Sequence, residues 1–115
     1  MGDRAQVKIV GDSEHPVYLY THWDGYEIKK VTANALNRGT SRWDDSEYLA
    51  RIIFSEMIRD DIDGTTGYGI STVQHEDIEV LVTVDCDCEE VSVEHLYENE
   101  TVRYSFEEFI NEFGG

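Results

Sequence analysis

The most chemically suggestive feature of this chain is a run of alternating carboxylates in its last third. Asp85, Asp87 and Glu89 occupy every second position. On a β-strand such side chains share a face and lie roughly 6.6 Å apart, at about 3.3 Å per residue. A row of this kind could enter a basic groove that holds a nucleic-acid backbone, whose phosphates recur about every 3.4 Å of axis. The other interpretation is a solvated outer face.

The charge of the chain is strongly uneven. Residues 76–115 hold 13 acids and a single base, Arg103, which gives −12, whereas the first 75 residues give −4 of the total −16. Such a field repels phosphates, so we expect no direct binding to nucleic acid and instead a basic nucleic-acid-binding protein as partner. The residues expected to meet that partner are Glu76, Asp77, Glu79, Asp85, Asp87, Glu89, Glu90, Glu94, Glu98 and Glu100.

The two cysteines, Cys86 and Cys88, raise the question of a metal site. Zinc sites usually take four ligands, with cysteines two to four residues apart, and here only one residue intervenes. His75 and His95 are the conceivable further ligands. We favour the interpretation that both cysteines are buried core residues. The sequence therefore predicts no metal and no cofactor, and so few cysteines favour a cytoplasmic protein.

Asp61-x-Asp63-Gly64 resembles part of a calcium loop, but the ligands at both ends of such a loop are missing. Aligning Gly64 with the invariant glycine of such a loop places Arg59 and Ile70 at the first and last ligand positions, where neither fits. We therefore expect a loop that follows a helix.

A catalytic site is equally weakly indicated. His22-Trp23-Asp24 lacks a recognisable nucleophile and orienting partner, and Trp23 is more simply a hydrophobic lead-in to a helix cap at Asp24. No glycine-rich phosphate loop and no serine or cysteine nucleophile motif is present. We expect no catalytic residue and no enzymatic activity.

The strands that would position the acidic row follow from alternation and turn residues. Ala5–Val10 and Val17–Thr21 are expected to form a hairpin, with a turn over residues 11–16. Further strands are expected over residues 67–73, 78–88, 91–95 and, at an edge, 101–104. In residues 78–88 the valines and both cysteines would face the core, and the carboxylates would face solvent.

Three helices are indicated by start signals. Asp24 to Glu27 and Asp44 to Glu47 fit helix N-termini before two apolar stripes, and Ser105 to Glu108 fits a capping box before Phe106, Phe109, Ile110 and Phe113. The second helix carries the widest apolar arc and is expected to be the most buried element. We predict a single domain over residues 1–115, of α+β class. Its antiparallel sheet of about five strands would carry two central helices on one face and a short C-terminal helix. The carboxylates would lie on the uncovered face.

Segments of the first two thirds resemble a family of small proteins that phages and prophages encode. The matching segments are VYLYTHW at 17–23, ALNRG at 35–39, RW at 42–43, YLARIIF at 48–54 and GYGIS at 67–71. The family has no assigned activity, so the resemblance implies a phage setting and nothing about chemistry. A small, highly acidic phage protein also has the profile of anti-CRISPR and anti-restriction inhibitors.

Two functions are therefore expected from the sequence. The first is a non-enzymatic inhibitor whose acidic face docks on a host defence complex in the host cytoplasm, with DNA mimicry as one form of that docking. The second is a phage accessory or virion protein whose charge serves solubility and whose Tyr18, Tyr20, Trp23 and Trp43 make the contacts. No apolar run is long enough to span a membrane, and we expect no secretory leader. Exposed strand edges would allow a homodimer.

Overall fold

The computed structural model describes residues 3–11 and 15–115, so residues 12–14 of the turn predicted over residues 11–16 lie outside the described residues. Six strands form one sheet in the order β3-β2-β1-β4-β5-β6. Their bounds are β1 (Ala5–Val10), β2 (Val17–Thr21), β3 (Tyr68–Ser71), β4 (Val80–Asp85), β5 (Glu90–His95) and β6 (Glu100–Ser105). The expected hairpin of β1 and β2 is confirmed, with Val7 opposite Leu19.

The α+β class is confirmed, but the sheet has six strands and is mixed rather than antiparallel. β4 pairs with β1 in parallel, with Val7 beside Val82, while every other neighbouring pair is antiparallel. Parallel neighbours need a long connection. Here residues 22–79, which contain two helices and β3, separate the β1–β2 hairpin from β4 and allow β4 to run beside β1 in the same direction.

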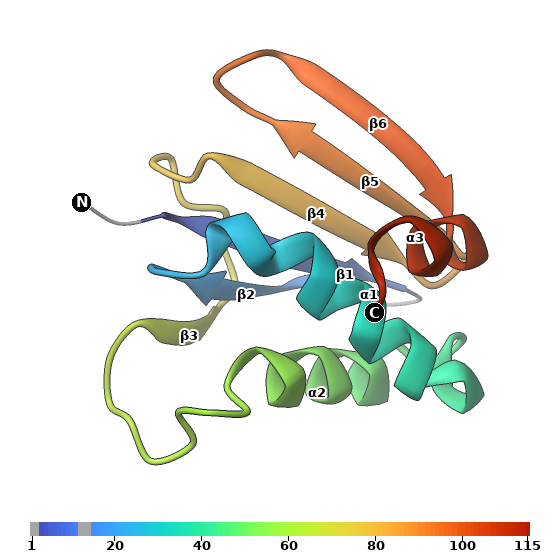
Figure 1. The fold of residues 1–115 in the computed structure, drawn as a ribbon, viewed down its shortest axis with the longest axis horizontal. Helices are drawn as coiled ribbons and strands as arrows, with labels where there is room; N and C mark the ends of the chain where they lie inside the picture. Colours follow the sequence, from blue (N-terminus) through green and yellow to red (C-terminus); the bar gives the residue numbers. More distant parts are fainter. Residues whose placement is uncertain (1–2, 12–14) are drawn as a thin grey trace.

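Three helices, α1 (Ile28–Arg38), α2 (Ser46–Met57) and α3 (Phe106–Phe113), pack against the sheet. Figure 1 shows α1 crossing β1 and β2, with α2 beside it and α3 at the end of β6. The expectation that α2 is the most buried element is wrong. α1 contacts both other helices and buries five side chains, against three for α2, because it lies between α2 and α3. No helix of the described chain is long and apolar enough to cross a bilayer.

The hydrophobic core fills the space between the helices and one face of the sheet. Val82 and Val93 are directly paired and fully enclosed, as are Leu36 on α1 and Ile53 on α2. The expected apolar stripe of α3 also packs here, with Phe109 completely buried. The valines that alternate along β4 and β5 therefore point into the core, as predicted.

The opposite face of the sheet carries the predicted carboxylates Asp85, Glu90 and Glu94, but these do not form a continuous row. Its central row is formed by directly paired neighbours on four strands, and two of them are cations: Lys8, Thr83, Ser92 and Arg103. The segment between β3 and β4 covers part of this face. The fully buried Gln6 anchors the segment, because its side chain donates to Val73 O (3.2 Å) and accepts from His75 N (2.8 Å).

The helix starts are confirmed at two of three places. Asp45 accepts from Tyr48 N at the start of α2, and Ser105 forms a complete capping box with Glu108 at α3. Asp24 does not cap a helix, since its carboxylate accepts a hydrogen bond from the Tyr68 hydroxyl. A short 3₁₀ turn, η1 (Gly25–Glu27), precedes α1 instead.

Candidate functional site

The predicted row of carboxylates on β4 is not formed, because the strand ends at Asp85. Residues 86–89 make a turn, in which Asp85 Oδ1 accepts hydrogen bonds from Asp87 N (2.9 Å) and Cys88 N (3.4 Å). Glu89 has a φ of 55°, which no strand residue adopts. An aspartate that bonds the backbone two residues further on favours a turn over a strand. Asp87 and Glu89 therefore leave the sheet.

This turn meets the first residues of α3 and α2 at one end of the sheet. Phe106 N donates to Glu89 O (3.1 Å), and Glu90 lies opposite Ser105. Ser46, at the start of α2, and Cys86 are both next to Gly11. Carboxylates from three segments thus gather at one place. We call the acidic end the set Asp44, Asp45, Asp85, Asp87, Glu89, Glu90, Glu107 and Glu108.

Four side chains of the acidic end remain available for a partner. Asp45 and Glu108 cap helices, and Asp85 holds the turn. The carboxylates of Asp44, Glu89, Glu90 and Glu107 are exposed, and none of them forms a hydrogen bond or ion pair with another described residue.

The pKa values of both thiols at the acidic end are raised, in part by the neighbouring carboxylates. Burial, followed by the charges of Asp85, Asp87, Asp45 and Asp44, raises the pKa of Cys86 to about 12. Cys86 is buried as predicted, but Cys88 is exposed, so the expectation that both cysteines belong to the core is wrong for Cys88. The reason is that Cys88 lies in the turn rather than on the strand. Its pKa is also raised, by desolvation and by a hydrogen bond with Asp85.

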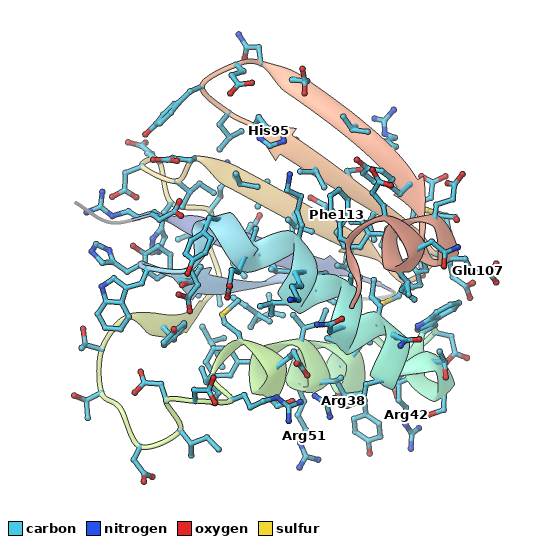
Figure 2. All side chains as sticks on the ribbon, viewed as in Figure 1. Arg38, Arg42, Arg51, His95, Glu107 and Phe113 are labelled. Carbon is cyan, nitrogen blue, oxygen red and sulfur yellow. The ribbon has the colours of Figure 1, made fainter. Side chains whose placement is uncertain are left out.

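The remaining predicted site residues lie at the opposite end of β4. They are Glu76, Asp77, Glu79, Glu94, Glu98 and Glu100, which we call the distal acids. Val80 is paired with His95 and His95 with Glu100, whereas Asp85 is paired with Glu90. β4 rises by about 17 Å over its five steps, at about 3.3 Å each, so the ten predicted residues form two groups. Figure 2 shows His95 and Glu107 at opposite ends of the β5–β6 ribbons.

The distal acids are partly engaged within the chain. Asp77 forms an ion pair with Arg4, in which Asp77 Oδ2 and Arg4 Nη1 are 3.5 Å apart and both side chains are exposed. Glu94 lies opposite Leu81 on the second face of the sheet and is half-buried. An exposed ion pair such as that of Arg4 and Asp77 contributes little to stability, typically about 0–1 kcal/mol. The distal acids are therefore a more dispersed and partly paired group than the acidic end.

Sequence reasoning missed Asp44, Asp45, Glu107 and Glu108 as members of one surface. Their only local signal is that they start helices, where acidic residues are common. The signal that joins them is topological, since two helix starts and one strand turn meet at the same end of the sheet. That meeting depends on the parallel pairing of β1 and β4.

The other candidate motifs do not come together as sites. His22 Nδ1 lies 3.2 Å from both Arg4 Nε and the Tyr20 hydroxyl. His75 packs on the Tyr20 ring, and His95 lies at the far end of β4 from the cysteines. Within residues 3–11 and 15–115, no three histidine, cysteine or acidic side chains are grouped as metal ligands. The Asp61–Gly64 segment is a loop after α2, as expected.

The comparisons with known proteins add no relative. No family model matches the chain, and neither a curated protein nor a solved structure matches it. The function must therefore be argued from the geometry of the chain itself.

Proposed function

We propose that this chain is a non-enzymatic, acidic inhibitor protein of the anti-CRISPR or anti-restriction type. It would bind a basic nucleic-acid-binding surface of a host defence complex, in the host cytoplasm, and compete there with the nucleic acid. The observation that carries the proposal is the acidic end, where Asp44, Glu89, Glu90 and Glu107 are exposed and unneutralised by the described cations. The phage setting is part of this proposal and comes from the resemblance of the sequence segments alone.

The acidic end suits a cationic partner for an electrostatic reason. Like charges within about 10 Å of one another repel at ordinary ionic strength, and a basic surface removes that repulsion on binding. Complementary charge mainly raises the association rate and the specificity. Because the carboxylates form a compact cluster rather than a regular row, the competition depends on the sign and density of charge and not on copying the phosphate spacing. The proposed competition therefore differs from the DNA mimicry that the sequence suggested, which relied on a regular row of carboxylates.

The test is a charge-neutralised variant with a matched control. Glu89→Gln, Glu90→Gln and Glu107→Gln together remove three charges from the acidic end. Glu76→Gln, Glu98→Gln and Glu100→Gln remove three from the distal acids. We expect the parent and the control to displace labelled DNA from a purified defence complex, and the first variant to lose at least tenfold in potency. Displacement should also weaken steeply between 50 and 300 mM NaCl, because salt screens the charges. Equal potency of both variants, or no displacement by the parent, would refute the proposal.

The accessory or virion protein is the second candidate, and the exposure of Trp23 favours it. Trp23 is 45% exposed and Tyr26 is 71% exposed, on the same connection between β2 and α1. The other aromatic residues expected to make contacts are used internally. Tyr18 is buried, and Trp43 donates to Leu36 O (2.9 Å). Capture of tagged chain from infected cells separates the candidates, since capsid or tail proteins would be recovered in one case and a nucleic-acid-binding complex in the other.

A further inference from the structure

The cations of this acidic chain are concentrated on its helix layer. Four of the nine lysines and arginines occur within residues 38–59. Arg38, Arg42 and Arg51 line a single cavity of about 550 Å³, together with Tyr48, Ile52 and Ser55. Figure 2 shows these three arginines on the solvent side of α2, away from Glu107. The cavity therefore lies on a different surface from the acidic end.

Two of the three guanidinium groups are held in place by the protein. Arg38 Nη2 donates to Ile52 O (3.1 Å) and to Ser55 Oγ (2.7 Å). The guanidinium of Arg42 lies over the ring of Tyr48, 4.6 Å from its centroid. A guanidinium that is stacked on a ring keeps its in-plane N–H donors free for a ligand. Fixing these groups in advance lowers the entropy that a ligand must lose on binding.

The positive charge of the cavity is only partly neutralised. Glu56 Oε1 lies 3.4 Å from Arg38 Nε, but the same oxygen is 2.6 Å from Nη2 of Arg59. Arg51 forms no hydrogen bond, ion pair or ring contact with another described residue, and it is exposed on α2. Three arginines thus face the cavity against one carboxylate that is shared with a fourth.

An apolar hollow adjoins the arginine cavity. Arg51 and Ser55 line both spaces, and the second one, of about 420 Å³, is formed mainly by apolar side chains such as Phe54, Ile58 and Ile70, with Glu47 as a carboxylate in its lining. Ile70, on β3, is 64% exposed. An anionic group in the arginine cavity would therefore have apolar surface within reach, from Tyr48 and Ile52 on one side of Arg51 and from this hollow on the other.

We propose that the arginine cavity binds a small phosphate monoester with an aromatic or apolar body. The guanidinium forks of Arg42 and Arg51 can bind phosphate oxygens in pairs, which suits a dianion with three terminal oxygens. Arg38, whose Nη2 already donates to Ile52 O and Ser55 Oγ, adds positive charge beside them. The volume lies in the range of about 300–1,000 Å³ that small-molecule sites occupy, and it exceeds that of phosphate alone. This inference is independent of the inhibitory function, because it uses none of the carboxylates of the acidic end.

Three matched probes test the proposal: phenyl phosphate, inorganic phosphate and phenol. Binding is followed by two-dimensional NMR of backbone amides and of the arginine Nε–H groups. We expect phenyl phosphate to shift the signals of Arg38, Arg42 and Arg51, and to bind more tightly than inorganic phosphate. Phenol should bind much more weakly than either. No shift at these residues, or equal affinity for phenyl phosphate and inorganic phosphate, would overturn the proposal.

Two variants distinguish binding in the arginine cavity from a general attraction of the phosphate to positive charge. Arg51→Gln removes one charge from the cavity, and Arg103→Gln removes the same charge from β6. We expect Arg51→Gln to weaken phenyl phosphate binding at least tenfold and Arg103→Gln to leave it within twofold of the parent. Equal weakening by both substitutions would show attraction to charge without a site, and would also overturn the proposal.

Discussion

At the residue scale, Gly67, just before the edge strand β3, occupies a position that only glycine fits. Its φ is 92°, a conformation that favours glycine, and a Cβ placed there would collide with the indole of Trp23. We expect Gly67→Ala to lower the free energy of unfolding by about 1–3 kcal/mol and to shift Trp23 fluorescence. Gly69→Ala is the control, because a Cβ there meets no atom within 4 Å. Equal losses in urea unfolding would contradict this account.

The two thiols should differ sharply in reactivity. Cys88 is exposed, whereas Cys86 is 5% exposed and burial raises its pKa to about 12. The thiolate is the reactive form, so Cys86 should be inert at pH 8. We expect iodoacetamide to add once to the native chain, at Cys88, and twice in urea, as read by mass spectrometry. A Cys88→Ser variant that is still alkylated in its native state would show that Cys86 is accessible.

The pKa of Cys86 also predicts a loss of stability at alkaline pH. Its folded value of about 12 exceeds the ordinary 9.0, so the folded chain holds this proton more tightly than the unfolded chain. The resulting stabilisation is complete below pH 9 and is lost as the pH rises toward 12. We expect the free energy of unfolding to fall from pH 8.5 to pH 10.5, and to fall less in Cys86→Ala. Tyr68, whose pKa burial also raises, contributes a fall of the same sign in both proteins. An identical fall in both would remove Cys86 as a cause.

At the scale of elements, α2 is held by packing rather than by its own helix propensity. Ile53 lies on the core-facing side of α2 and is fully buried, whereas Ile62, in the loop that follows, is 72% exposed. Ile53→Ala should lower the free energy of unfolding by about 2–5 kcal/mol, because it leaves a cavity in the core. Ile62→Ala makes the same chemical change and should cost below about 0.5 kcal/mol. Comparable losses in the two variants would mean that α2 does not pack as described.

Local patterns were enough to predict most of the elements. Alternation located β1 and β5, aromatic and β-branched residues located β2, and the capping box at Ser105 located α3, because each signal lies within a few neighbouring residues. The cap at Asp24 failed for a non-local reason. Tyr26 N donates instead to Asp3 Oδ2 (2.8 Å), a residue 23 positions away, and Tyr68 occupies the carboxylate of Asp24. Contacts of that range leave no trace in a short window of sequence.

The candidate site was predicted less well than the fold. The alternation that predicts β4 continues to Cys88, but the carboxylate of Asp85 bonds the backbone and ends the strand. The acids after residue 75 were foreseeable from composition, whereas their division into two groups depends on where β4 ends. The arginine cavity had no sequence signal, since Arg38 and Arg51 lie on two helices whose packing only the structure shows.

At the scale of the whole molecule, the topology separates two kinds of charge. The segment over residues 76–115, which contains β4, β5 and β6 and the turns that connect them, holds most of the excess negative charge, whereas the arginines of α1 and α2 lie on the helix layer. Three ion pairs are described within residues 3–11 and 15–115, and two of them share Glu56. The excess negative charge is therefore not cancelled inside the chain. A surface with this much repulsion lowers the stability of the free protein and favours a cationic partner.

That repulsion predicts a stability that rises with salt. The screening length falls from about 30 Å at 0.01 M to about 3 Å at 1 M ionic strength, so added NaCl weakens repulsion among exposed carboxylates. We expect the melting temperature to rise between 20 and 500 mM NaCl. Replacing Glu89, Glu90 and Glu107 by Gln should raise it at 20 mM and reduce the effect of salt, whereas Arg103→Gln, which makes the net charge more negative, should enlarge the effect.

The direction of these changes decides how the acidic end is to be understood. If its carboxylates destabilise the free chain and their neutral variants fold more stably, the charge is retained against stability, as is common for binding surfaces. A melting temperature that does not respond to salt, or a neutralised variant that is less stable than the parent, would show instead that the acidic end contributes to the fold. The argument for a cationic partner would then lose its electrostatic basis.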